Sequence, residues 1–234
     1  LEIRVRNELD RHRLEEFQFV EEALDGWRGQ LVHPEFLAGE VIGEDFRRRL
    51  RILGDNAVRG KGEGGSEGTE SAVTAALRWL KRAQSSNGMW DCDSWTHMEK
   101  HPKDGSNAGD ARYDTGITAM ALLAFLGNGH THRFGTFKRT VNKGLTWLKR
   151  QQKSDGAISF EGGETIYNHA IGTMALCEAY AVSRDFTLKR YAEKAINFCI
   201  KGQNPNLGWQ YGLKTGKNDT SITGWMLMAL KGGK

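Results

Sequence analysis

The chain repeats one short pattern three times, and this repetition limits the folds that are open to it. Each copy is a segment with apolar residues at helical spacing, followed by a Gln and then by a turn that contains Gly. The copies recur at a period of about 50 to 70 residues, and units of this kind bury their apolar faces only by stacking on neighbours. The turns span 84–90, 152–156 and 203–209.

A second repeated part, an apolar helix that opens on a polar residue, is expected between the turns. The opening residues are Asp114, Asn168 and Asp219. No segment has the pattern of a strand of any length, so the sequence predicts an all-α array of helical hairpins. Helices are expected at about 69–84, 114–126, 136–151, 168–182, 188–201 and 220–230.

The composition changes sharply at residues 54–68, where Gly alternates with charged residues. This pattern is typical of a linker and marks the predicted domain boundary. Residues 1–53 lie outside the repeat and show two amphipathic patterns, which predict an N-terminal helical segment. Their basic cluster, Arg47 to Arg51, has acidic neighbours and is interpreted as a solvated helix face. The repeat domain is expected to span 69–234.

The charge and cysteine content of the chain exclude several classes of protein. Lys and Arg number 33 against 29 Asp and Glu, a net charge of +4 that predicts no nucleic-acid partner. The three cysteines have no CxxC spacing, which favours a reduced, cytoplasmic protein. The longest apolar run, 117–126, is too short to be a transmembrane segment, which needs roughly 20 residues. Because the chain begins without Met and stops directly after an apolar helix, we expect a fragment whose N-terminus is missing.

The Gln turns and the segments around them resemble the QW-type repeats of the prenyltransferase and squalene oxidase repeat family. That family includes squalene and oxidosqualene cyclases and the β subunits of protein prenyltransferases. The segments 166–180, 208–211 and 219–230 most resemble squalene-cyclase-like proteins of planctomycete-type bacteria. The resemblance covers 69–231 and implies a partial (α/α) toroid, with about three of the five to six helix pairs of a full ring. The helices opening at Asp114, Asn168 and Asp219 would be its inner helices around a cavity.

The resemblance carries over only part of the family's chemistry. Triterpene cyclases protonate their substrate with a D-x-D-D motif, of which only Asp114 and the Thr after it are kept here; Asp91-Cys92-Asp93 resembles half of the motif but follows an outer-helix turn. The zinc site of the prenyltransferases would need a Cys where this chain has Gly116. No metal and no cofactor are therefore expected. The loop cluster of Asp91, Cys92, Asp93, His97 and His101 is interpreted as solvated.

Candidate site residues lie at the starts of the expected inner helices and among the aromatic residues. Asp114, His169 and Asp219 are the catalytic candidates, expected together at one end of the cavity; helix capping is the alternative role for the two carboxylates. Trp79, Trp90 and Trp147 are assigned to packing between outer helices. The ligand-binding candidates, which could line a cavity, are Tyr167, Glu178, Trp209, Tyr211 and Trp225.

Two functional classes remain open. In one, the toroid binds a hydrophobic, isoprenoid-like ligand in a central cavity without a recognisable D-x-D-D acid or zinc triad. A non-catalytic scaffold for protein interaction is the alternative within this class. In the other class, the chain belongs to an enzyme, a divergent terpenoid cyclase or a prenyltransferase-like protein. An apolar edge is expected at Trp225, Met226, Met228 and Leu230, covered by residues 1–53, a second chain or missing C-terminal repeats.

Overall fold

The structure is a computed structural model that describes residues 67–93, 109–205 and 207–233. These residues form no strand, and a single isolated β-bridge joins Gln152 to Ile158. The prediction of an all-α fold is confirmed for the described residues. The N-terminal segment 1–53 and nearly all of the linker 54–68 lie outside the described residues. The α-helices are α4 (Glu67–Ala83), α5 (Asp114–Gly127), α6 (Lys138–Arg150), α7 (Ile166–Ser183), α8 (Phe186–Gly202) and α9 (Thr220–Gly232).

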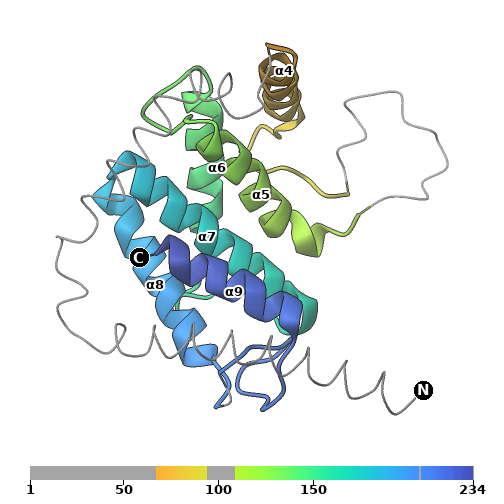
Figure 1. Ribbon diagram of the computed structural model, residues 1–234, viewed down its shortest axis with the longest axis vertical. Helices are drawn as coiled ribbons and strands as arrows, with labels where there is room; N and C mark the ends of the chain where they lie inside the picture. The colour runs from red at the N-terminus through yellow and green to blue at the C-terminus, as the bar shows by residue number, and fades with distance from the viewer. Residues whose placement is uncertain (1–66, 94–108, 206, 234) are drawn as a thin grey trace, which may run out of the picture. The chain divides into compact units, whose positions relative to one another are not determined.

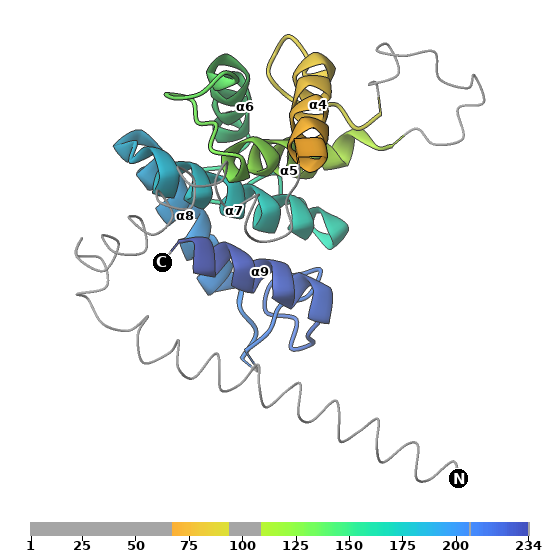
Figure 2. The same cartoon turned by 45° about the horizontal axis from the view of Figure 1, so that its top comes forward.

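Three of these helices form a central row. Helices α5, α7 and α9 lie side by side and run in the same direction, with α7 in the middle (Figures 1 and 2). Helices α4 and α6 pack against α5, while α8 packs against α7 and α9. The helices that the sequence assigns to the inner position are therefore neighbours, and the other three flank them.

The central helices are apolar on nearly every side because they contact helices on more than one side. Leu122 and Phe125 of α5 and Leu176 of α7 are fully buried. Val141 and Leu148 of the flanking helix α6 complete the same core. Helices α4 to α8 thus share one hydrophobic core, and Trp225 of α9 packs against it.

The starts of the helices correct one sequence prediction. Asp219 caps α9, because its carboxylate accepts the N–H of Ile222 at 2.9 Å, and Asp185 caps α8 through the N–H of Thr187. Asn168, in contrast, does not open α7, which already begins at Ile166. The Asn168 side chain bonds instead to the start of a neighbouring helix.

Asn168 caps the neighbouring helix rather than its own. Its Oδ1 accepts the N–H of Gly116 at 3.1 Å, and its Nδ2 donates to the carbonyl of Arg112 at 2.7 Å. Gly116 is the third residue of α5, so this N–H has no partner within α5. A Cβ on Gly116 would lie 2.9 Å from Asn168 Oδ1. The absence of a side chain at Gly116 therefore leaves room for this cap.

The three Gln turns have one common hydrogen-bond pattern. Each Gln donates from Nε2 to the carbonyl four residues later, which belongs to Gly88, Gly156 or Leu207, and these residues have φ of +105°, +99° and +77°. Gln84 also donates to the carbonyl of Thr140 in α6 at 3.0 Å, and Gln152 to that of Tyr191 in α8 at 2.8 Å. The Gln side chains thus connect consecutive flanking helices.

The turn glycines allow the next flanking helix to approach closely. A Cβ on Gly88 would lie 2.5 Å from the carbonyl oxygen of Lys143, and one on Gly156 would overlap that of Lys194. Leu207 stands at this position in the third turn. A further helix docked there in the same way would meet the Leu207 side chain.

The end of α9 differs from the apolar edge expected from the sequence. Met226 and Leu230 are buried and Trp225 is half-buried against the core, because α9 packs these residues on its neighbours. Of the four residues only Met228 is exposed, at 42%. The edge was predicted to be covered by residues 1–53, a second chain or missing C-terminal repeats, and what covers it stays a prediction. Over the described residues, the structure contains no helix with the length and apolar character needed to cross a bilayer.

Candidate functional site

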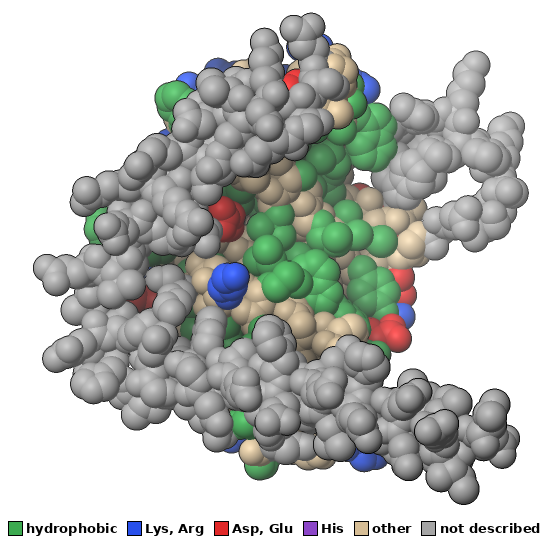
Figure 3. Space-filling model, in the orientation of Figure 1, with side chains coloured by type: hydrophobic (Ala, Val, Ile, Leu, Met, Phe, Trp, Pro, Cys, Tyr) green, Lys and Arg blue, Asp and Glu red, His purple; other side chains and the backbone are tan. Residues whose placement is uncertain are grey.

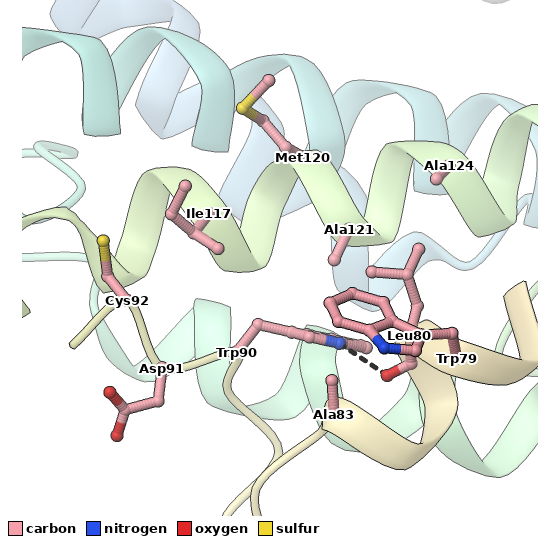
Figure 4. A pocket seen from close by; sticks show the side chains of 10 residues that line it. All are labelled: Trp79, Leu80, Ala83, Trp90, Asp91, Cys92, Ile117, Met120, Ala121 and Ala124. Carbon is pink, nitrogen blue, oxygen red and sulfur yellow. Dashed lines mark hydrogen bonds between the residues drawn. The ribbon is translucent and has the colours of Figure 1, made fainter. Parts of the chain in front are cut away.

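A cavity of about 620 Å³ lies between α4 and α5, beside the first Gln turn (Figure 4). Ligand-binding cavities in proteins typically have volumes of about 300 to 1,000 Å³, so its size suits a small organic ligand. Its walls are almost wholly apolar. The lining residues are Trp79, Leu80, Ala83, Trp90, Asp91, Cys92, Ile117, Met120, Ala121 and Ala124.

One wall of the cavity is fixed by hydrogen bonds. The Trp90 backbone N–H donates to Thr118 Oγ1 at 2.9 Å, and the indole Nε1 donates to the Leu80 carbonyl at 2.8 Å. Trp90 is 3% exposed and its ring packs near that of Phe125. Both polar groups of this tryptophan are satisfied, so it presents only apolar ring surface to the cavity.

The opposite wall is a stripe of exposed apolar residues on α5. Ile117, Met120 and Ala124 follow one another at spacings of three and four residues, which places them on one helix face. Trp79 of α4, 38% exposed, lies on the side of α5 to which Ala121 points, whereas Met120 points to the other side (Figure 4). Apolar side chains also gather on the surface over α5, α7 and α9 (Figure 3). Exposed apolar surface of this kind typically marks a binding site.

Three carboxylates meet beside the cavity. One oxygen each of Asp91, Asp93 and Asp114 lies within 4.8 Å of the others. Asp114 accepts the backbone N–H of Cys92 at 2.7 Å, which joins the loop after α4 to the start of α5. Burial, together with the negative charges of Asp91 and Asp93, raises the pKa of the Asp114 carboxyl above its ordinary value. The fold thus brings a D-x-D segment, Asp91 to Asp93, next to Asp114 from a distant part of the sequence.

The carboxylates of this cluster do not face the aromatic rings of the cavity. The carboxylate of Asp91 points away from the rings of Trp79 and Trp90 (Figure 4), and Asp114 is not among the lining residues. Three carboxylates offer oxygen ligands that hard cations such as Ca²⁺ prefer, but grouped carboxylates are common on protein surfaces and do not by themselves identify an ion. His97 and His101 of the same sequence cluster lie outside the described residues.

The candidates Asp219 and His169 share no hydrogen-bond partner with Asp114. Asp219 accepts from Ser221 Oγ and from the N–H of Ile222, and these bonds lower the pKa of its carboxyl. This is the capping role that was the alternative to catalysis.

His169 is a buried core residue. Its Nδ1 accepts the N–H of Ile158 at 3.2 Å, so the ring proton is on Nε2, which lies 3.1 Å from the Sγ of Cys199. The ring also packs on Phe198, with centroids 4.6 Å apart. Complete burial lowers the pKa of His169 to about 3. The imidazole is therefore neutral and fully engaged near pH 7.

The repeat explains the position of His169. The N–H groups of Trp90 and Trp209 donate to Thr118 and Thr223, just as the N–H of Ile158 donates to His169. His169 therefore occupies the position that is Thr in the other two central helices. The residues four positions earlier are Asp114, Thr165 and Asp219, so the sequence alignment of Asn168 with Asp114 was wrong by three residues.

We expect His169 to make the free energy of unfolding depend on pH. Between its ordinary pKa of 6.5 and its folded pKa of about 3, the unfolded chain binds a proton that the folded chain excludes. Stability should therefore fall as the pH drops below about 6.5, by at most about 1.4 kcal/mol per pH unit from this group. Urea unfolding at several pH values should show a shallower dependence for His169→Thr, which keeps an acceptor for Ile158. Equal slopes in the two proteins would contradict this account.

The five predicted ligand-binding residues lie away from this cavity. Trp209 is buried and donates from Nε1 to the Cys199 carbonyl, as Trp90 does to Leu80. The Tyr167 hydroxyl is 2.6 Å from Ser221 Oγ, and the Tyr167 ring lies 6.4 Å from that of Tyr211. Glu178 and Trp225 are half-buried on α7 and α9. None of the five lines the cavity, and their role in binding stays a prediction.

None of the residues that line the cavity is a ligand-binding candidate from the sequence. Trp79 was assigned to packing, although it lies off the stripe formed by Leu77 and Leu80 and could have been recognised by that offset. Ile117 and Met120 belong to a continuous apolar run, in which the sequence does not distinguish exposed residues from buried ones.

Searches with protein-family models, against curated proteins and against solved structures find no match to this chain.

Proposed function

We propose that this chain is a helical-repeat module, part of an (α/α) toroid, that binds an apolar, isoprenoid-like ligand between α4 and α5. The observation that carries the proposal is the cavity of about 620 Å³, whose wall contains two tryptophans and is otherwise aliphatic except for Asp91 and Cys92. Hydrocarbon ligands gain affinity mainly from the apolar surface that they and the cavity remove from water. The parallel central helices and the Gln links between flanking helices support the toroid.

Binding without acid catalysis is favoured over a divergent cyclase. Protonation of an alkene requires an acid aimed at the bound hydrocarbon. Asp114, the carboxyl with the raised pKa, accepts a backbone N–H and lies outside the lining, and Asp91 points away from the rings. The apolar walls support a binding role, while no described acid points into the cavity.

Farnesol binding tests this proposal. Titration of the full chain with farnesol, followed by calorimetry, should give saturable binding. Ile117→Glu places a carboxylate in the cavity wall and should weaken binding at least tenfold, because an apolar ligand would bury that charge.

The matched control is Ile200→Glu. Ile200 is 41% exposed against 39% for Ile117, but it lies on α8 and does not line the cavity. This variant should bind farnesol like the parent chain. Equal losses in both variants, or a parent chain that does not bind farnesol, would contradict the proposal and favour the interaction scaffold. Turnover of squalene that is lost in Asp114→Asn would instead favour the cyclase.

A further inference from the structure

Two phenylalanines on the described surface are far more exposed than any other large apolar side chain described. Phe134, in the loop between α5 and α6, is 76% exposed, and Phe186, the first residue of α8, is 73% exposed. Phe137 in the same loop is buried and packs on Phe125. The loop therefore buries one phenylalanine and turns the other outward.

The two exposed rings belong to one region of the surface. His132 Nε2 lies 2.9 Å from Asp185 Oδ2, and Arg133 Nη2 lies 3.4 Å from Asp185 Oδ1. These contacts tie the α5–α6 loop to the start of α8. Phe134 follows Arg133 and Phe186 follows Asp185, so each ring adjoins one partner of the ion pair. We call residues 130–139 and 183–190 the Phe134–Phe186 patch.

The loop holds Phe134 in a fixed place. Thr131 Oγ1 accepts the N–H groups of Arg133 and Phe134 at 3.1 and 2.9 Å. The Thr131 N–H donates to the Phe134 carbonyl at 3.0 Å. A ring presented by an ordered turn loses little conformational freedom when it binds.

The charge of the Phe134–Phe186 patch is almost all positive. Asp185 is its only acidic residue, and that carboxylate is already engaged by His132, Arg133 and the N–H of Thr187. Outside the patch, acidic and basic residues are nearly balanced, since the whole chain has a net charge of only +4. The basic residues of the patch are Arg133, Lys138, Arg139, Arg184, Lys189 and Arg190.

We propose that the Phe134–Phe186 patch docks the protein on the surface of an anionic lipid bilayer. The basic side chains would lie at the lipid headgroups, and the two rings would insert among the outermost acyl carbons. Clusters of Lys and Arg bind anionic leaflets by charge, and apolar residues beside them add a second, non-electrostatic contribution.

Vesicle binding tests the proposal. The full chain is sedimented with vesicles of phosphatidylcholine alone or with about 30% phosphatidylserine, at low and at high salt. We expect binding to the phosphatidylserine vesicles, weakened by salt. Phe134→Ser with Phe186→Ser, and separately Lys138→Gln with Arg139→Gln, should each lower the partition coefficient at least tenfold.

Matched variants elsewhere serve as controls. Ile200→Ser removes an exposed apolar residue from α8, and Lys81→Gln with Arg82→Gln removes two cations from the last turn of α4. Both should bind vesicles like the parent chain, and all variants should keep its urea midpoint. Equal binding to neutral vesicles, or patch variants that bind like the parent, would overturn the proposal. The proposal would also be overturned if the chain bound a short DNA duplex and not vesicles, and if Lys138→Gln with Arg139→Gln abolished that DNA binding.

Discussion

Gly156→Ala is expected to destabilise the fold by about 2 to 5 kcal/mol. Two costs combine at this position. Gly156 has φ of +99°, a conformation that costs an L-residue about 1 to 2 kcal/mol. The added methyl group would also overlap the carbonyl of Lys194, and overpacking typically costs about 1 to 3 kcal/mol. Urea unfolding followed by circular dichroism measures the sum, and Gly88→Ala should behave alike because it faces Lys143 in the same way.

Gly162→Ala separates the two costs. Gly162 has almost the same φ, +98°, but a Cβ there would meet nothing within 4 Å. Its substitution should cost only the conformational part, about 1 to 3 kcal/mol at its ψ of 167°. Leu207→Gly is the reverse change at the equivalent position of the third turn and should leave stability unchanged or raise it. If Gly162→Ala is as harmful as Gly156→Ala, close helix approach is not what requires glycine in these turns.

Asn168→Ala is expected to cost about 2 to 6 kcal/mol. The substitution leaves the N–H of Gly116 and the carbonyl of Arg112 without their partner at a site where Asn168 is 1% exposed. Each unsatisfied buried polar group costs about 1 to 3 kcal/mol. Because the bonds join α7 to the start of α5, hydrogen exchange at the first turn of α5 should speed up along with the loss of global stability.

Asn128→Ala is the control for this change. Asn128 also adjoins α5, but at its C-terminal end, where it contributes only its backbone N–H to the cap. Its substitution should change the free energy of unfolding by no more than about 0.5 kcal/mol. If Asn168→Ala costs no more than Asn128→Ala, the cross-helix cap does not stabilise α5.

The sequence predicts the bounds of the described helices well. It predicts less well which residues of neighbouring helices lie opposite one another. Apolar spacing and capping residues locate the six α-helices of the described residues to within a few positions, because these signals are local. Asn168 misleads because a polar residue before an apolar run looks like a cap for its own helix. Its actual partners, Gly116 and Arg112, are more than 50 residues away in the chain and become visible only when α5 and α7 lie together.

In the candidate site, too, roles set by nearby residues in the sequence can be predicted, and roles set by contacts between distant residues cannot. The role of Asp219 as a cap follows from its own helix. The meeting of Asp91 and Asp93 with Asp114 depends on how the loop after α4 returns to α5. The burial of His169 likewise depends on Ile158 and Phe198, which come from different elements. Function follows from such distant contacts, so its prediction from sequence is weaker than that of the helices.

The Gln links between flanking helices affect how far the sequence of such a chain can diverge in evolution. Gln84 and Gln152 bind the carbonyl groups of Thr140 and Tyr191, and every amino acid offers the same carbonyl. Substitutions at 140 or 191 therefore leave the link intact as long as the helix keeps its path. An architecture held together by contacts to the main chain tolerates extensive divergence of side chains, so related proteins can keep this arrangement of helices long after their sequences have ceased to resemble one another.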